Sequence, residues 1–376
     1  MTRKERLIAT LEGRTVDRPA VNFYEIGGFV VHPGDPAPYN IYHSPDWQPL
    51  LKLAEEQTDV IRMMKVKSQP QNQPLVQTWE EVRSRFTKTT LSIAGKEYTS
   101  LTRRDADIDT VWHLEHLLKS EDDVEAWLTL PDEFFDCTYD ISPHLQQEEL
   151  LGDKGIVMMD FPDHLNRAAR LMDMQDFLMM AFANPELMHR LLERTARIAQ
   201  REAEYSASAF PGRLWRLTGA EYATEPYMSP ELFRDYWLRY ATSFIKTIHS
   251  TGGYARVHLH GRIRHVLDAL AESGADAIDP IEPPHQGDVE LRDVRANYGK
   301  QFVLFGNLEI TDIENLPPEQ FKDKIKRALD EGTQGEGRGF VLMPSASPYG
   351  RTISATTLQN YEQMVELTQI HNQEKA

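Results

Sequence analysis

The chain has 376 residues and a formal net charge of −17, with 41 lysines and arginines against 58 aspartates and glutamates. This acidic balance argues against nucleic acid as a partner and favours small molecules or proteins. The single cysteine, Cys137, excludes an intramolecular disulfide and any cysteine-rich zinc or iron–sulfur site. The N-terminus has no signal-peptide core and no run reaches about 18 apolar residues, so we expect a cytoplasmic protein that does not span a membrane.

Strand-like and helical patterns alternate along almost the whole chain. A first helix is predicted at residues 2–12, where Thr2 and Glu5 have the spacing of a capping box. Apolar runs typical of strands lie at residues 20–25, 59–66, 155–160, 213–219, 254–260, 275–282, 301–308 and 339–344. Helical patterns lie at residues 46–56, 121–150, 174–207, 229–251, 317–331 and 354–371. Short alternating runs around Gly95 indicate a β-hairpin inserted near residues 78–113.

This alternation predicts a parallel sheet, and about eight strand–helix units predict one (β/α)8 TIM-barrel domain over residues 1–376. An open doubly wound sheet is the alternative, but the Gly-x-Gly-x-x-Gly fingerprint that such sheets often carry is absent. In a barrel, functional groups gather at the carboxyl ends of the strands. These ends carry Asp160, Glu221, Tyr222, His258, His260, Glu282, Asn307, Ser345 and Ser347.

The most informative stretch is residues 254–282. His258 and His260 are two positions apart at the end of a predicted strand, so both imidazoles point to the same face. Glu282 ends the next predicted strand, and neighbouring parallel strands bring it close to the histidines. The sequence therefore predicts His258, His260 and Glu282 as metal ligands. The alternative is a pair of hydrogen-bonded histidines with no metal.

The other strand-end residues have roles suggested by their chemistry. Glu221 and Tyr222 follow the strand before the histidines and are the catalytic candidates, as a base and as a hydrogen-bond donor to substrate. The alternative for Glu221 is a helix cap or an arginine partner. Trp215 and Tyr227 are candidates for the wall around an apolar or aromatic ligand. The predicted substrate-binding residues are Asp160, Trp215, Tyr227, Asn307 and Ser345.

Several segments resemble the uroporphyrinogen decarboxylase superfamily. They are residues 219–233, His-Leu-His-Gly at 258–261, Gly-Ala-Asp at 274–276 and Leu-Phe-Gly-Asn-Leu at 304–308. Members of the superfamily are (β/α)8 barrels, which agrees with the strand count. Its decarboxylases carry an arginine after the first strand and an aspartate after the second, and neither is found at residues 22–29 or 62–68. The chain therefore looks nearer to the cobalamin-dependent methyltransferase branch.

That branch resembles this chain at the histidine pair but differs in its ligands. Its members hold zinc on a His-x-Cys pair and on a cysteine after the last strand, and the similar barrel of cobalamin-independent methionine synthase adds a glutamate. His258 matches the histidine, His260 the first cysteine and Glu282 the interval of the glutamate, as in a His-x-His subgroup. The last cysteine has no match, because residues 344–348 read Pro-Ser-Ala-Ser-Pro. Two histidines and a carboxylate favour zinc bound to oxygen ligands, with iron(II) as the alternative.

The function implied by this resemblance is that of a metal-dependent methyltransferase or demethylase component. It would move a methyl group between a small substrate and a corrinoid protein. The methylcobalamin would come on this partner, because the chain lacks an Asp-x-His-x-x-Gly stretch of the kind that corrinoid modules use. The resemblance also suggests a homodimer. Alternatives of other classes are a metal-dependent decarboxylase or lyase acting on a small carboxylic acid, and a ligand-binding barrel without activity.

Overall fold

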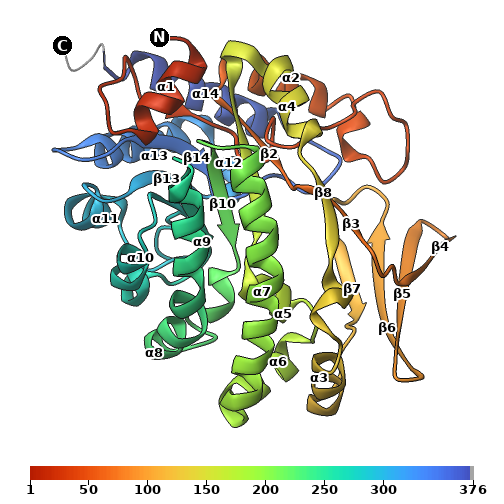
Figure 1. The fold of residues 1–376 in the computed structure, drawn as a ribbon. Helices are drawn as coiled ribbons and strands as arrows, with labels where there is room; N and C mark the ends of the chain where they lie inside the picture. The colour runs from red at the N-terminus through yellow and green to blue at the C-terminus, as the bar shows by residue number, and fades with distance from the viewer. Residues whose placement is uncertain (373–376) are drawn as a thin grey trace.

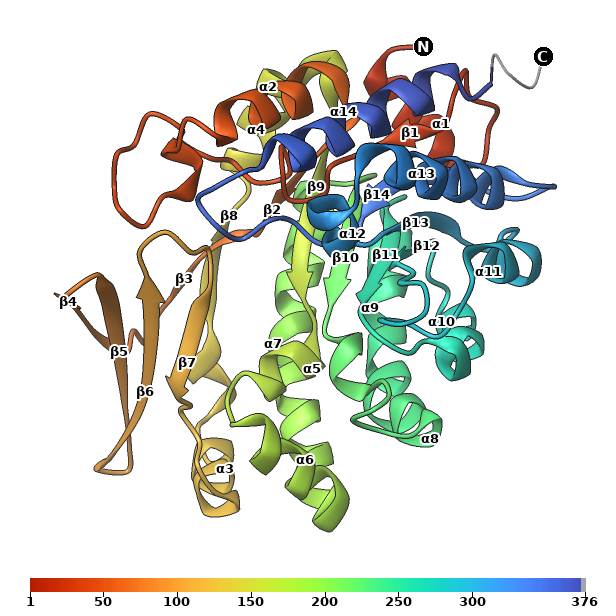
Figure 2. The same ribbon diagram turned by 180° about the vertical axis from the view of Figure 1, so that it is seen from behind.

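The computed structural model describes residues 1–372 and contains an eight-stranded parallel sheet. In chain order its strands are β1 (Ala20–Val21), β2 (Val60–Met64), β9 (Gly155–Pro162), β10 (Leu214–Thr218), β11 (Tyr254–Leu259), β12 (Ala277–Pro280), β13 (Val303–Leu308) and β14 (Phe340–Pro344). The spatial order is β1-β14-β13-β12-β11-β10-β9-β2, so the sheet curls round until β1 and β2 meet. The predicted α/β barrel fold is confirmed (Figure 1, Figure 2).

Asp59 closes the seam between β1 and β2. Its backbone N–H donates to the Val21 carbonyl at 2.7 Å, and its carboxylate accepts the Val21 N–H at 2.9 Å. The same buried carboxylate accepts from Arg6 at 2.5 Å and Arg18 at 2.8 Å. These charged contacts satisfy backbone and side-chain groups that two short strands alone would leave unpaired.

Helices surround the sheet and also close one end of it. They are α1 (Arg3–Leu11), α2 (Trp47–Gln57), α3 (Glu121–Leu128), α4 (Ser142–Leu151), α5 (His164–Ala169), α6 (Met174–Ala183), α7 (Pro185–Ala209), α8 (Pro230–Phe233), α9 (Arg239–Ser250), α10 (Leu267–Ser273), α11 (Leu291–Tyr298), α12 (Ile310–Asn315), α13 (Pro318–Thr333) and α14 (Ala355–Ile370). A π-helical turn, Arg234–Leu238, joins α8 to α9. Both hydrogen bonds of the predicted capping box between Thr2 and Glu5 are formed at α1. Within residues 1–372, no helix is both long and apolar enough to cross a membrane.

The strands separate two hydrophobic cores. Interior side chains such as Met158, Leu214 and Val303 pack together inside the barrel, with Leu7 of α1 covering the amino-terminal end. Side chains at alternate positions, such as Leu217, pack outward in the larger core beneath the helices. This alternation leaves little room for polar groups inside the barrel except near the carboxyl ends of the strands.

A layer of charged side chains lies in the barrel interior, next to the apolar layer on the side of the carboxyl ends of the strands. Arg216 of β10 is in register with Asp160 of β9 and Arg256 of β11. One step further along, His258 of β11 is in register with Asp279 of β12. The barrel register therefore builds a charged floor beneath the histidine pair.

An insertion between β2 and β9 projects from one side of the barrel (Figure 1, Figure 2). The hairpin predicted near residues 78–113 is present but belongs to a larger structure, a four-stranded antiparallel sheet of β4 (Leu75–Glu81), β5 (Ser84–Ile93), β6 (Lys96–Asp105) and β7 (Val111–Glu115). Strands β3 (Lys67–Pro70) and β8 (Cys137–Asp140) form an antiparallel ribbon at its base. Strands β4 and β7 have every side chain exposed, so neither strand buries one face.

Candidate active site

His258 and His260 lie side by side at the carboxyl end of β11. Their imidazole centroids are 4.7 Å apart and their ring planes are perpendicular. The strand pattern predicted that both rings point to one side of the sheet, and this prediction is confirmed. The His258 ring also stacks on Tyr24, which follows β1, at 5.9 Å.

A buried ion pair holds His258 from below. Asp279 Oδ2 lies 2.7 Å from His258 Nδ1, and the same carboxylate accepts two hydrogen bonds from Arg256 at 2.6 and 2.7 Å. Burial alone raises the pKa of Asp279, but the charges of Arg256 and His258 outweigh it and hold the pKa well below its usual range. Asp279 is therefore ionised and accepts a hydrogen bond from Nδ1–H, which leaves Nε2 as the nitrogen of His258 that is not engaged by Asp279.

Glu282 holds His260 in the same way. Glu282 Oε1 lies 2.8 Å from His260 Nδ1, and Oε2 accepts the Gly261 N–H at 2.7 Å. Burial lowers the pKa of His260, but the hydrogen bond and charge of Glu282 reverse this and raise the pKa above its ordinary value. Glu282 lies beyond the end of β12, and Ile281 between them has φ of 57°, a left-handed conformation that turns the chain toward His260.

These contacts change the predicted role of Glu282. Both of its carboxylate oxygens are already engaged, so it orients His260 instead of standing beside it as a third ligand. Within residues 1–372, no three histidine, cysteine, aspartate or glutamate side chains converge as a metal-binding group. The predicted three-ligand set is therefore not assembled in this structure.

The histidine pair itself fits a metal. Histidines that bind metals usually donate their other ring N–H to a carboxylate, which fixes the tautomer and increases the basicity of the ligating nitrogen. Here Asp279 and Glu282 each occupy an Nδ1 position, so both Nε2 atoms remain as donors. The donor set suits zinc or iron(II).

Glu221 is a further carboxylate near the histidine pair, and its charge acts on both imidazoles. It lies in the 3-10 turn Ala220–Ala223 directly after β10, where one of its oxygens accepts the Gly219 N–H at 2.9 Å. Burial raises the pKa of Glu221, and the nearby His258 charge partly offsets this rise. Tyr222, the next residue, is partly buried, and its burial raises the pKa of the phenol.

A cavity of about 530 Å³ opens at this end of the barrel. Its wall includes four predicted site residues, Glu221, Tyr222, Tyr227 and His260. The wall also contains residues from α5, from the start of α6 and from the end of the insertion: His113, His116, Ala169, Arg170, Met172, Asp173 and Met174. The volume is in the range of sites that bind small molecules. The structure thus brings the candidate catalytic pair and one histidine to a common cavity.

Four of the five predicted substrate-binding residues do not line this cavity, and for Asp160 and Trp215 the correction follows from the strand alternation. Asp160 is buried inside the barrel, where Arg216 Nε and Nη2 contact its Oδ1 at 2.9 and 2.8 Å. Trp215 faces the helices, where its ring lies 5.5 Å from that of Phe161 between centroids, at an interplanar angle of 67°. It is 1% exposed. Asp160 therefore supports the charged floor, and Trp215 belongs to the outer core.

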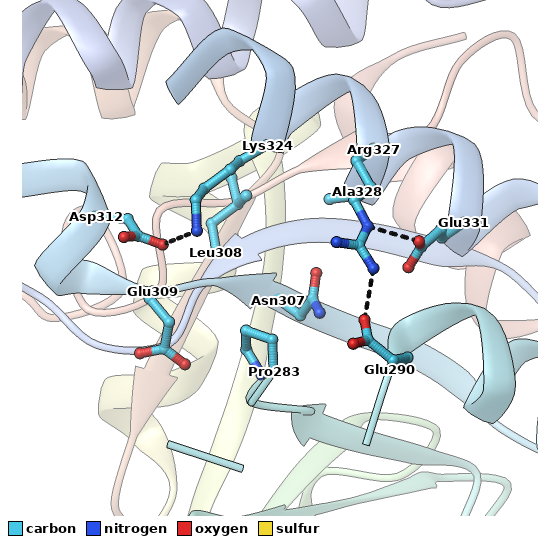
Figure 3. A pocket seen from close by; sticks show the side chains of 10 residues that line it. All are labelled: Pro283, Glu290, Asn307, Leu308, Glu309, Asp312, Lys324, Arg327, Ala328 and Glu331. Carbon is cyan, nitrogen blue, oxygen red and sulfur yellow. Dashed lines mark hydrogen bonds and ion pairs between the residues drawn. The ribbon is translucent and has the colours of Figure 1, made fainter. Parts of the chain in front are cut away.

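Asn307 lies in a different place from the one predicted. Figure 3 shows its amide directed toward α13, in a small cavity of about 70 Å³. Ion pairs of Lys324 with Asp312 at 2.7 Å and of Arg327 with Glu290 at 2.6 Å lie around this cavity. Asn307 lines this small cavity, together with Glu309, and does not line the mouth cavity.

Ser345 positions a carboxylate that the sequence reasoning missed. Its buried hydroxyl accepts the Ile310 N–H at 3.1 Å and donates to Glu309 Oε2 at 3.1 Å. Glu309 Oε1 is buried and has no hydrogen-bond partner. Burial, and after it the charge of Glu282, raise the pKa of Glu309 to about 7. Glu309 could have been found from its position in the sequence, because it directly follows the strand β13.

Glu25 is a second missed carboxylate. It follows Tyr24 at the end of the first predicted strand, and its carboxylate makes no hydrogen bond or ion pair with the described residues. Burial raises its pKa, and the Arg216 charge opposes this rise. The carboxyl end of the barrel thus carries several carboxyl groups, Glu25, Glu221 and Glu309, in which burial favours the protonated form.

Comparison with known proteins places this barrel in a family. A family model described as uroporphyrinogen decarboxylase (URO-D) matches residues 165–371, more than half of the chain. The chain belongs to the uroporphyrinogen decarboxylase family. It is a URO-D-like enzyme, and the matched region contains the histidine pair, Glu221, Glu282 and Glu309.

Solved structures agree with the fold. A methyltransferase from Methanosarcina mazei superposes with a TM-score of 0.64 and 15% sequence identity, covering 100% of both chains. At this identity the match establishes a shared fold. D-psicose 3-epimerase, in a structure determined with D-fructose, gives a TM-score of 0.36 and 7% identity over 65% of this chain and 84% of the other, which is too distant to support an argument. No curated protein matches the chain significantly.

Proposed function

We propose that this URO-D-like enzyme is a metal-dependent methyltransferase or demethylase component. It moves a methyl group between a small substrate in the mouth cavity and a corrinoid protein that carries methylcobalamin. The observation that carries the proposal is the paired arrangement of His258 and His260, each with its Nδ1 on a carboxylate and with no hydrogen bond from its Nε2 to residues 1–372. Structural likeness to a protein named as a methyltransferase supports it.

His258 and His260 would hold the metal through Nε2, and Glu221 is the third candidate ligand. Zinc, with iron(II) as the alternative, would supply a Lewis acid that polarises an oxygen or thiol of the substrate. Asp279 and Glu282 keep the two imidazoles in the required tautomer.

The remaining residues bind and orient the substrate. Tyr222 can donate a hydrogen bond to a substrate oxygen, and Tyr227 provides an aromatic wall beside it. If Glu221 stays free of the metal, its raised pKa suits it to take or return a proton at the reacting atom. The partly enclosed cavity removes water from the substrate while the corrinoid protein covers its opening.

Loss of the methyl group from methylcobalamin tests this function. Zinc-loaded protein is mixed with methylcobalamin and a panel of small thiols and phenols, and demethylation is followed by absorbance. We expect turnover with at least one acceptor, and its loss in His258→Ala and His260→Ala. His265→Ala is the matched control, because His265 is exposed and lies outside the cavity. Equal activity in all three variants would contradict the assignment of the histidines.

A decarboxylase or lyase acting on a small carboxylic acid is the second candidate. The pKa of Glu309, raised to about 7 by burial, favours it, because such a carboxyl group can deliver a proton near neutral pH. Release of carbon dioxide from a small acid without any corrinoid would support this candidate over methyl transfer.

A further inference from the structure

One wall of the mouth cavity carries an arginine and two imidazoles that the histidine pair does not explain. Arg170, at the end of α5, and His113 and His116, from the end of the insertion, line it together. We propose that this wall binds the anionic group of the substrate, and that the substrate is a small carboxylic acid with an apolar or aromatic body. This inference rests on the proposed function, since it assigns the substrate class of the same cavity.

Arg170 has a charge with no internal partner. In a chain with 58 acidic residues, its guanidinium makes no ion pair or hydrogen bond with the described residues. Arg167, one turn earlier, is paired with Glu202 at 2.9 Å. An unpaired arginine that lines a cavity is suited to a carboxylate, which it can bind with two parallel hydrogen bonds.

The Arg170 charge acts on both sides of the cavity. Burial lowers the pKa of His113, and the Arg170 charge lowers it further. On the other side, burial raises the pKa of Tyr222 and the Arg170 charge opposes this rise. The guanidinium therefore lies between the insertion and the turn that carries Glu221, where a bound anion can contact both.

Two hydrogen bonds fix the insertion to the barrel at this point. His116 Nδ1 lies 3.3 Å from the Arg170 carbonyl, and the Leu118 N–H donates to the Leu171 carbonyl at 2.8 Å. The His113 and His116 rings stack at 5.2 Å with an interplanar angle of 20°. The insertion thus presents two imidazoles beside Arg170.

The rest of the wall suits an apolar or aromatic body. Met172, Met174, Pro226 and Tyr227 line the same cavity as Arg170 and His260. Thioether and aromatic groups pack well against aromatic rings. Among the acidic lining residues, Asp173 uses its carboxylate to cap α6 at 2.9 Å. A substrate held by its carboxylate at Arg170 would therefore direct its opposite end toward His260.

Binding of two matched probes tests the inference. Isothermal titration calorimetry measures the dissociation constants of 4-methoxybenzoate and of its neutral analogue 4-methoxybenzyl alcohol, with the full chain and without added metal or corrinoid. We expect the acid to bind at least about tenfold more tightly, since hydrogen bonds to charged groups have this magnitude. Arg170→Met should abolish the preference, and Arg170→Lys should keep part of it. Arg292→Met is the control, because Arg292 is exposed on α11 and outside the cavity.

Equal binding of the two probes, or an acid preference that survives in Arg170→Met, would overturn the inference. The inference would also be overturned if the acid shows no binding at 10 mM, a concentration that as a dissociation constant corresponds to a binding free energy of about −3 kcal/mol. Thermal denaturation of each variant verifies that it is folded. If the acid preference is found but zinc-loaded protein never demethylates methylcobalamin, the substrate class stands and the proposed function fails. If methyl transfer occurs and Arg170→Met leaves the KM for the substrate unchanged, the proposed function stands and the assignment of the substrate class fails.

Discussion

Asp279 is the buried carboxylate on which the geometry of the candidate site depends, and Asp279→Asn tests that dependence. The carboxylate accepts two hydrogen bonds from Arg256 and one from His258, all between 2.6 and 2.7 Å. Asparagine keeps the shape of the side chain but replaces one acceptor oxygen with an NH2 donor. This NH2 group would then face an N–H donor of Arg256 or His258 in a buried site. Loss of one partner of a buried ion pair costs about 3–5 kcal/mol. We expect the free energy of unfolding, measured by urea denaturation, to fall by about this amount.

The same substitution should also weaken metal binding. An amide NH2 facing His258 Nδ1 forces that nitrogen to accept, and the ring proton then moves to Nε2, where it blocks a metal. Loss of such a supporting carboxylate lowers metal affinity by about 10–100-fold. Asp235→Asn is the matched control, because Asp235 bonds His189 at 3.0 Å on a partly exposed helix and should cost less than about 1 kcal/mol. An Asp279→Asn protein with unchanged stability and zinc affinity would refute the reasoning.

Three further predictions concern stability. Trp215→Ala should lower the free energy of unfolding by about 3–5 kcal/mol without changing ligand affinity, since Trp215 lies in the outer core; altered affinity in the calorimeter would place it in the site. Burial raises the pKa of Glu309 to about 7, so its stabilising contribution is present below pH 4.5 and lost as the pH rises through 7. Glu309→Gln should therefore be more stable than the wild type at pH 8 by up to about 3 kcal/mol, and the advantage should vanish at pH 4.5 in urea denaturation. Burial lowers the pKa of His164 to about 4, so the wild type loses stability as the pH falls from 6.5 toward 4. In His164→Gln that loss should be smaller by about 3 kcal/mol, and an identical pH profile would show that His164 does not cause it.

The barrel was predictable because each of its strands is an apolar run flanked by helical patterns. The runs at residues 155–160 and 339–344 are almost wholly buried in β9 and β14, as continuous apolar stretches in parallel strands should be. The insertion was predicted only in part. Alternating runs indicated a hairpin there, but strand β7 has no buried face, so no buried side chain indicates that it pairs with β6 in a larger sheet.

The parts of the site that depend on the alternation of side chains along one strand were predictable. The parts that depend on the register between neighbouring strands were not. His258 and His260 share a face because they are two positions apart in one strand. The partner of His258 is Asp279, and this depends on which residues of β11 and β12 lie in register, which a single sequence does not reveal. Trp215 was misplaced because its neighbour Arg216 occupies the interior position, where an apolar side chain is expected.

The zinc stoichiometry of the purified protein tests the central claim most directly. Wild type, His258→Ala, His260→Ala and the control His265→Ala are saturated with zinc, desalted and analysed for bound metal. The account predicts about one equivalent in the wild type and the control, and a large loss in both site variants. Less than about one tenth of an equivalent in the wild type, or equal zinc in all four proteins, would contradict it.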